Sequence, residues 1–210
     1  MNTSKLMIAA VACAAGLMTI DARAEIGDTG ISPYISAQIG YGAAAWKDMD
    51  ILPHGVMYSG AVGASIRTSP INLRAEFEYA GAKHVASESD EFGVYPNYFE
   101  VELDPTIKSA LYMANLYVDF LEDYALKPYL GVGLGRGKLT FSEKEYDFYT
   151  GDYMGTWSAS ESGMTWGAYA GIGFKMFGGL SGDIGARFNS VDAGDGIYLF
   201  GLNAGLRYNF

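Results

Sequence analysis

The chain has 210 residues, of which half are apolar and 28 are glycine, and its formal net charge is −10. A charge of this sign argues against nucleic acid as a partner, because phosphate contacts need lysine and arginine. Beyond residue 24, no apolar run approaches the roughly 18–20 residues of a transmembrane helix. Such a composition suits a wall with one apolar face and one polar face.

The first 24 residues have the three parts of a secretory signal peptide. Lys5 supplies a positive charge, residues 6–20 are apolar, and residues 22–24 have the small-x-small pattern of a cleavage site. The alternatives are an uncleaved N-terminal helix and a lipoprotein signal centred on Cys13. We expect cleavage and an exported domain spanning 25–210. Because Cys13 is the only cysteine, that domain is expected to form no disulfide and no thiolate metal site.

Apolar and polar residues alternate with period two from Ser32 onward, which is typical of strands with two unlike faces. The third alternating segment sets Phe77 against Glu76 and Glu78. In the fifth segment the phase changes near 136–139, which predicts a bulge or the strand leaving the membrane. Eight such segments follow one another, at about 32–42, 55–67, 71–79, 107–120, 128–139, 164–175, 180–189 and 198–210.

The connections between these segments alternate in length. Those at 69–70, 122–125 and 178–179 are short, whereas those at 45–54, 81–105, 142–162 and 191–196 are mostly longer. Short turns at one end and longer loops at the other are typical of an up-and-down outer-membrane barrel. We therefore predict an all-β fold: an eight-stranded antiparallel transmembrane β-barrel in the cell outer membrane. The alternative is a soluble lipocalin-type barrel, which has an apolar lumen and usually a C-terminal helix that this sequence lacks.

The polar faces of the segments carry charges of both signs. Because an eight-stranded barrel is narrow and filled by side chains, these charges are expected to neutralise one another in a plugged lumen. The predicted lumen network consists of Arg74, Glu76, Glu78, Asp119, Lys175, Asp183, Arg187 and Arg207.

Several segments resemble strands of the small outer-membrane β-barrel family, which includes the OmpA transmembrane domain and opacity-like surface antigens. The resemblance is carried by NLYVDF at 115–120, KPYLGVGLG at 127–135 and the glycine-rich segment 166–174. It spans the exported domain and implies its fold and location. It does not imply one activity, because the family includes adhesins, structural barrels and barrels of unknown role. Nothing in the sequence corresponds to a peptidoglycan-binding domain, so wall anchoring is not expected.

The last eight residues resemble the insertion signal of outer-membrane barrels. The matching residues are Asn203, Gly205, Tyr208 and Phe210. The family resemblance implies that the barrel-assembly machinery recognises this segment during insertion. A final strand with an aromatic-tipped apolar face and a free edge would suit such pairing.

Acidic and aromatic residues gather in two of the longer connections. Residues 81–105 contain six acidic residues against one lysine, and residues 142–162 contain five against one. One hypothesis is a recognition surface for a host or surface ligand, with aromatic anchors; the other is ordinary loop packing and solubility. The candidate recognition residues are Phe92, Tyr95, Tyr98, Phe99, Tyr149, Tyr153 and Trp157.

The sequence offers little for catalysis. A Ser-His-acid triad needs a histidine, and only His54 and His84 are present, both in predicted loops. They lack the spacing of a metal site, and the carboxylates near 192–196 are better explained by a tight turn than by calcium binding. We expect no enzyme activity, no cofactor and no metal.

Three functions follow from these patterns. The first is a structural or surface-interaction barrel, adhesin-like or opacity-like, that acts through its acidic and aromatic loops. The second is a small porin-like channel or ligand carrier, and the third is a lipid-modifying enzyme. In each case the surrounding partners are outer-membrane lipid and lipopolysaccharide, and no nucleic acid is expected.

Overall fold

The computed structural model describes residues 30–46, 52–68, 71–85, 106–121, 124–146, 153–193 and 196–210. The predicted signal peptide, residues 1–24, lies outside the described residues. The described part of the chain contains no helix that is long and apolar enough to cross a membrane.

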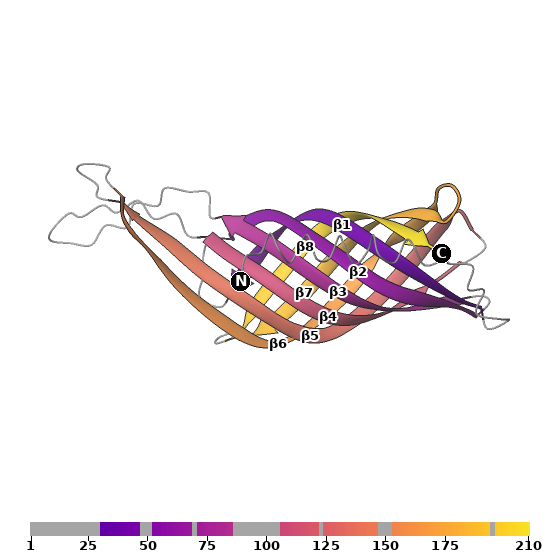
Figure 1. Ribbon diagram of the computed structural model, residues 1–210, viewed down its shortest axis with the longest axis horizontal. Helices are drawn as coiled ribbons and strands as arrows, with labels where there is room; N and C mark the ends of the chain where they lie inside the picture. Colours follow the sequence, from indigo (N-terminus) through magenta and orange to yellow (C-terminus); the bar gives the residue numbers. More distant parts are fainter. Residues whose placement is uncertain are drawn as a thin grey trace.

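Eight antiparallel strands form one closed barrel in the order of the chain, so the predicted all-β fold is confirmed (Figure 1). The barrel closes where β1 pairs with β8, with Tyr34 opposite Asn209. Every strand therefore has two neighbours and no edge faces the surroundings along the barrel wall. The strands are β1 (Ile31–Trp46), β2 (His54–Thr68), β3 (Ile71–Val85), β4 (Thr106–Asp119), β5 (Leu126–Tyr146), β6 (Tyr153–Lys175), β7 (Leu180–Asp192) and β8 (Ile197–Asn209).

Side chains alternate between the lumen and the outer wall, as the period-two pattern predicts. On β3, Arg74, Glu76 and Glu78 are buried while Leu73 and Phe77 are exposed, and the side chain of Phe77 is 72% exposed. In an all-β barrel this narrow, the inward residues fill the interior. Buried polar residues and exposed large apolar residues are the reverse of a soluble core, and they fit a wall that faces lipid.

Inward glycines make room for large side chains in this lumen. A Cβ atom placed on Gly131 would overlap the ring of Tyr117, and one placed on Gly133 would overlap the amide of Asn115. The glycines of β5 therefore leave the space that the side chains of Asn115 and Tyr117 on β4 occupy. Glycine in a strand commonly marks such a close approach.

The connections that follow β2, β4 and β6 lie at the end where β1 begins and β8 ends, and they span 69–70, 120–125 and 176–179. Residues 176–180 form one of them, in which Leu180 donates a hydrogen bond to the carbonyl of Phe177 at 3.0 Å. Gly178 has a φ of +58°, a conformation that glycine adopts without steric cost. The other four connections lie at the opposite end. Those at 47–53 and 86–105 are longer, but those at 147–152 and 193–196 are no longer than the connection at 120–125, so the predicted difference in length holds only in part.

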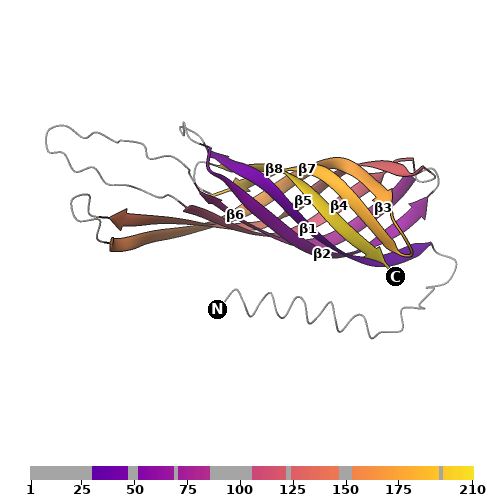
Figure 2. The same ribbon diagram turned by 90° about the horizontal axis from the view of Figure 1, so that it is seen from above.

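The predicted loop at 142–162 is wrong for most of its length. β5 continues to Tyr146 and β6 begins at Tyr153, so the two strands form a ladder that projects beyond the rest of the barrel (Figure 2). β4 stops pairing with β5 at Ser142, and β7 stops pairing with β6 at Met164. Beyond these points the ladder is outside the wall and has no lipid-facing side, so its sequence shows no apolar alternation.

Of the two interpretations of residues 136–139, a bulge or the strand leaving the membrane, the bulge is absent. β5 and β6 stay in register here, and their only irregularity lies between Glu145 and Tyr146. Leu139 is fully buried in the lumen, while Arg136 and Lys138 are exposed on the outer wall. The alternation of polar and apolar residues is reversed here although the strand is regular. The cause is that the inward residues become apolar and the outward residues become basic at this height.

Candidate functional site

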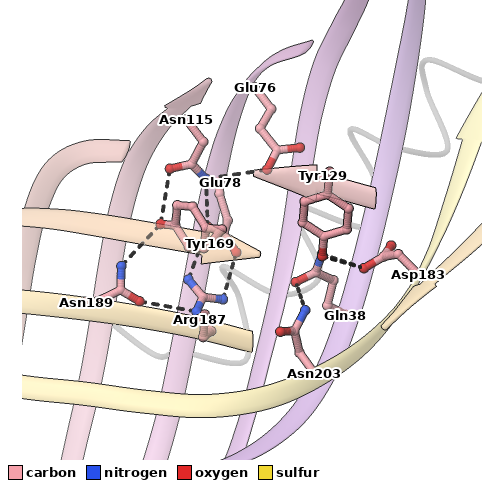
Figure 3. Close-up of polar contacts among 10 residues, drawn as sticks. All are labelled: Gln38, Glu76, Glu78, Asn115, Tyr129, Tyr169, Asp183, Arg187, Asn189 and Asn203. Carbon is pink, nitrogen blue, oxygen red and sulfur yellow. Dashed lines mark hydrogen bonds and ion pairs between the residues drawn. The ribbon is translucent and has the colours of Figure 1, made fainter. Parts of the chain in front are cut away.

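A buried ion pair organises the centre of the lumen (Figure 3). Arg187 on β7 donates two hydrogen bonds to the carboxylate of Glu78 on β3, at 2.9 and 3.2 Å. The same guanidinium donates from Nε to the side-chain oxygen of Asn189 at 3.2 Å. This two-bond geometry is a strong form of ion pair, and it links opposite sides of the barrel across the lumen.

Asn115 connects this pair to a second carboxylate. Its amide nitrogen donates to Glu78 at 2.9 Å and lies 3.4 Å from Glu76. Its oxygen accepts a hydrogen bond from the hydroxyl of Tyr169 at 3.2 Å, and Glu76 accepts another from Tyr34 at 2.9 Å. Neutral donors therefore contact both carboxylates, and Arg187 pairs with one of them, Glu78.

A second ion pair lies nearer the end with short turns. Arg74 contacts one oxygen of Asp119 through both Nε and a terminal nitrogen, each at 2.9 Å. Asn72 donates to the other oxygen of Asp119 at 2.9 Å. The guanidinium carbon of Arg74 lies 4.4 Å from the ring centre of Tyr117 and 5.2 Å from that of Tyr129. Contacts of this kind between arginine and an aromatic face are attractive.

A third group of polar residues lies beside β8. Asn203 donates to the oxygen of Gln38 at 2.8 Å, and Asp183 lies 3.4 Å from Gln38 and 3.5 Å from the hydroxyl of Tyr129. Arg207 is half-buried and donates to the hydroxyl of Ser181 at 3.3 Å. Four members of this group, Gln38, Tyr129, Asp183 and Arg207, border a small recess that has room for about one water molecule.

The structure thus brings seven of the eight predicted lumen residues into contact with other lumen side chains, in three groups. The exception is Lys175, whose side chain is exposed. It is the last residue of β6, where the strand leaves the barrel and its inward side opens to solvent. Lys127, which is not a member of the predicted lumen network, is buried and borders the recess. Its alternation with Tyr129 was the signal that could have identified it.

The lumen is apolar towards the end with the long connections. Leu139 and Val191 are fully buried there, and so is His84, whose two ring nitrogens have no hydrogen-bond partner among the described residues. The predicted lumen network does not include this layer, because the prediction rests only on the polar members of the inward face. The apolar cluster consists of Ala44, Ala80, Ile107, Leu111, Met113, Leu139, Val191, Ala193, Ile197 and Leu199, with Phe141 packed against it.

Aromatic side chains form a band around the outer wall. The rings of Tyr58, Tyr79 and Tyr112 follow one another on β2, β3 and β4, with centres 6.5 and 5.3 Å apart. On the other side of the barrel, the rings of Trp166 and Phe188 are 5.2 Å apart. Aromatic belts of this kind lie where the hydrocarbon of a membrane meets the polar headgroups.

The predicted recognition residues are only partly within the described residues. Phe92, Tyr95, Tyr98, Phe99 and Tyr149 lie outside them. Tyr153 is the first residue of β6, and Trp157 lies on the projecting ladder with 63% of its side chain exposed.

The predicted insertion residues lie on β8. Tyr208 is exposed on the outer wall and its ring packs edge-on against that of Phe210, with centres 5.3 Å apart. Asn203 points into the lumen, where it contacts Gln38. Gly205 lies opposite Gln38 on β1 and opposite Asp183 on β7.

In the part of the chain that the structure describes, no group of three His, Cys, Asp or Glu side chains could hold a metal ion. His54 is exposed at the start of β2, and its Nδ1 lies 3.3 Å from the carbonyl of Leu52. Neither histidine has a serine and an acid within hydrogen-bond distance among the described residues.

The model of the outer membrane protein beta-barrel domain family matches residues 8–210 of the chain. The chain belongs to this family. As a member of the outer membrane protein beta-barrel domain family, it is located in the cell outer membrane, and its short turns mark the periplasmic end. The predictions of family and of location are confirmed.

Solved structures of outer-membrane proteins are similar to this barrel. Neisserial surface protein A (NspA) is 19% identical, with a TM-score of 0.55, over 86% of this chain and 99% of that one. Ail of Yersinia pestis, solved with a heparin analogue, is 19% identical with a TM-score of 0.47, over 85% and 99% of the two chains. A major outer membrane protein of Thermus thermophilus is 13% identical with a TM-score of 0.47, over 86% and 99%. Comparison with curated proteins gave no match. The similarity to NspA, at 19% identity and a TM-score of 0.55, supports the fold alone.

Proposed function

We propose that this outer-membrane barrel is a sealed membrane anchor whose specific role is to bind a ligand at the cell surface. The observation that carries the proposal is the contrast between the two regions of the protein. Side chains fill the lumen, whereas the β5–β6 ladder projects from the external end with exposed backbone edges and an exposed Trp157.

The sealed lumen argues against the channel and carrier hypotheses. The buried ion pair Arg187–Glu78 crosses the interior between β7 and β3, and the ion pair Arg74–Asp119 joins the neighbouring strands β3 and β4 at a different height. The apolar cluster closes the external end above them. A hydrated ion would have to break a buried ion pair and enter an apolar layer, and both steps are costly.

The projecting ladder has the geometry of an interaction surface. Residues 153–163 of β6 extend beyond the point at which β7 pairs with it, and residues 143–146 of β5 extend beyond β4. Strand edges without a neighbour offer backbone donors and acceptors to an extended segment of a partner. The exposed Trp157 could anchor such a partner, since tryptophan is enriched among the residues that dominate binding energy.

The test is binding of cells or surface ligands by bacteria that display the full chain. Shortening the ladder by removal of residues 145–154 is expected to reduce binding strongly, and Trp157→Ala is expected to reduce it in part. Ser158→Ala, a change at the adjacent exposed position, serves as the matched control. Unchanged binding after the deletion, with the barrel still folded, would refute the role of the ladder and leave residues 86–105 as the alternative surface.

We also infer that β8 directs assembly through Asn203, Gly205, Tyr208 and Phe210. Support comes from the aromatic pair at the end of the closing strand, in which the exposed Tyr208 packs against the half-buried Phe210. The barrel-assembly machinery would be the partner. Replacing Phe210 with Ser is expected to lower the amount of barrel in the outer membrane, and fractionation of membranes would measure it; an unchanged amount would contradict the inference.

A further inference from the structure

Four basic side chains project from the outer wall on three neighbouring strands. They are Lys83 of β3, Lys108 of β4, and Arg136 and Lys138 of β5, and all four are exposed. We call them the basic quartet. Each has the same strand phase as the lipid-facing residues farther down its own strand, so the quartet belongs to the outer wall and not to the lumen.

The register of the sheet brings the quartet together. Lys83 lies directly opposite Lys108, and Cβ atoms of such partners are about 4.5–5.5 Å apart. Lys138 lies opposite Ala110, two residues from Lys108, which is a diagonal neighbour at about 7–8 Å. Arg136 comes two residues before Lys138 on the same face of β5. Four positive charges therefore share one patch of wall.

The chain supplies no counter-charge to this patch within its described residues. None of the four side chains has a hydrogen bond or an ion pair to another described residue, and the outward neighbours Val56, Thr140 and Ser162 are neutral. Asp192 is exposed on β7, but β6 lies between it and the quartet. Glu161 is exposed on β6 at the strand phase opposite to that of Ser162.

Like charges placed directly opposite one another destabilise a sheet. The arrangement of Lys83 and Lys108 therefore has an energetic cost unless an anion lies between them. This is the first observation that points to a ligand.

The height of the quartet on the wall is the second observation. Arg136 lies opposite Tyr112, a member of the aromatic band. Lys83 and Lys108 lie four residues beyond Tyr79 and Tyr112 towards the external end, about 13 Å along each strand at 3.3 Å per residue. Since the band marks the boundary of the hydrocarbon, the quartet lies at the level of the headgroups of the outer leaflet.

We propose that the basic quartet binds the phosphate groups of the lipid in the outer leaflet. A lipid phosphate is an anion with several acceptor oxygens, and lysine and arginine are its usual partners. The patch faces sideways into the membrane at headgroup level, where such a phosphate is in permanent contact with the wall. The proposal rests on the fold and the membrane location, and it is independent of the surface ligand proposed above.

The test uses the full exported domain folded in detergent micelles and two probes that differ only in phosphate. The probes are lipid A with both phosphates and the same lipid A after enzymatic removal of the phosphates. The wild-type barrel is expected to bind the phosphorylated lipid at least tenfold more tightly. A lysine near an anionic lipid surface changes affinity about fivefold, so Lys83→Gln with Lys108→Gln is expected to weaken binding roughly 25-fold.

Two variants separate charge from structure. Lys83→Arg with Lys108→Arg keeps both charges and is expected to retain binding. Lys175→Gln removes an exposed positive charge at the periplasmic end and is expected to change nothing. Heat-modifiable gel mobility shows that each variant is folded, and the comparison of the two lipids on the wild-type protein needs no variant.

Two results would overturn the proposal. Equal affinity of the wild-type barrel for the two lipids would show that phosphate is not recognised. Competition by millimolar inorganic phosphate that removes the lipid completely would identify a site for a soluble anion and not for a membrane lipid.

Discussion

The buried pair of Arg187 and Glu78 should make a large contribution to the stability of the barrel. Both side chains are less than a tenth exposed, and the guanidinium donates two hydrogen bonds to the carboxylate. Arg187→Met removes both donors and leaves a buried carboxylate without its counter-charge. Breaking a buried pair in this way costs about 3–5 kcal/mol of unfolding free energy, and Glu78→Gln is expected to cost a similar amount.

The double variant should be less destabilised than the sum of the two changes. Replacing both partners leaves no uncompensated buried charge, and that charge is the main cost of breaking a buried pair. We therefore expect Glu78→Gln with Arg187→Met to lie within about 2 kcal/mol of the wild type. Arg207→Met is the matched control, because Arg207 is half-buried and donates to Ser181 at 3.3 Å; its loss is expected to cost about 1 kcal/mol.

Equilibrium unfolding in urea, with the barrel in phospholipid vesicles, measures these free energies. Tryptophan fluorescence and gel mobility without boiling follow the transition. Single changes that each cost less than about 1 kcal/mol, or a double variant equal to the sum of its parts, would refute the reasoning that the pair is a coupled structural element.

Three further predictions follow from the same structure. Gly131→Ala should lower the free energy of unfolding by about 1–3 kcal/mol, because the new methyl group overlaps the ring of Tyr117. Gly60→Ala, where only one atom lies within 4 Å of the new methyl group, should be close to neutral in the same urea titration. Phe77→Lys should cost about 2–4 kcal/mol because it places a charge on the lipid-facing wall, and Trp157→Lys on the projecting ladder should cost little; equal costs would contradict the assignment of the wall to lipid. The wild-type barrel in planar bilayers should show no large steady conductance, and regular openings would show that the lumen is not sealed.

Period-two alternation determines much of this protein without any tertiary information. Which face of a strand a residue occupies depends only on its phase, because successive side chains point to opposite sides. The placement of Glu76, Glu78 and Arg187 in the lumen therefore follows from local pattern. The number of segments and the unequal connections similarly predict an even, closed barrel with two unlike ends.

Period-two alternation stops predicting strands where the two sides of a strand no longer differ in polarity as lumen and lipid do. At Arg136 and Lys138 the outer wall leaves the hydrocarbon and the lumen becomes apolar. The alternation of polar and apolar residues is therefore reversed although the strand is unbroken. On the ladder around Trp157 both faces meet water, so two strands resemble a loop. In both places backbone hydrogen bonds continue the strand although the side-chain pattern no longer reports it.

The pairing of charges was decided only by the tertiary structure. Arg187 and Glu78 are 109 residues apart in the chain, and the offset between strands around the closed barrel sets which lumen residues share a height. The same offset places Lys83 opposite Lys108 on the outside. The sequence by itself determined the face of each residue, because alternation is local, and closure of the barrel decided the neighbours, because register is set by all eight strands together.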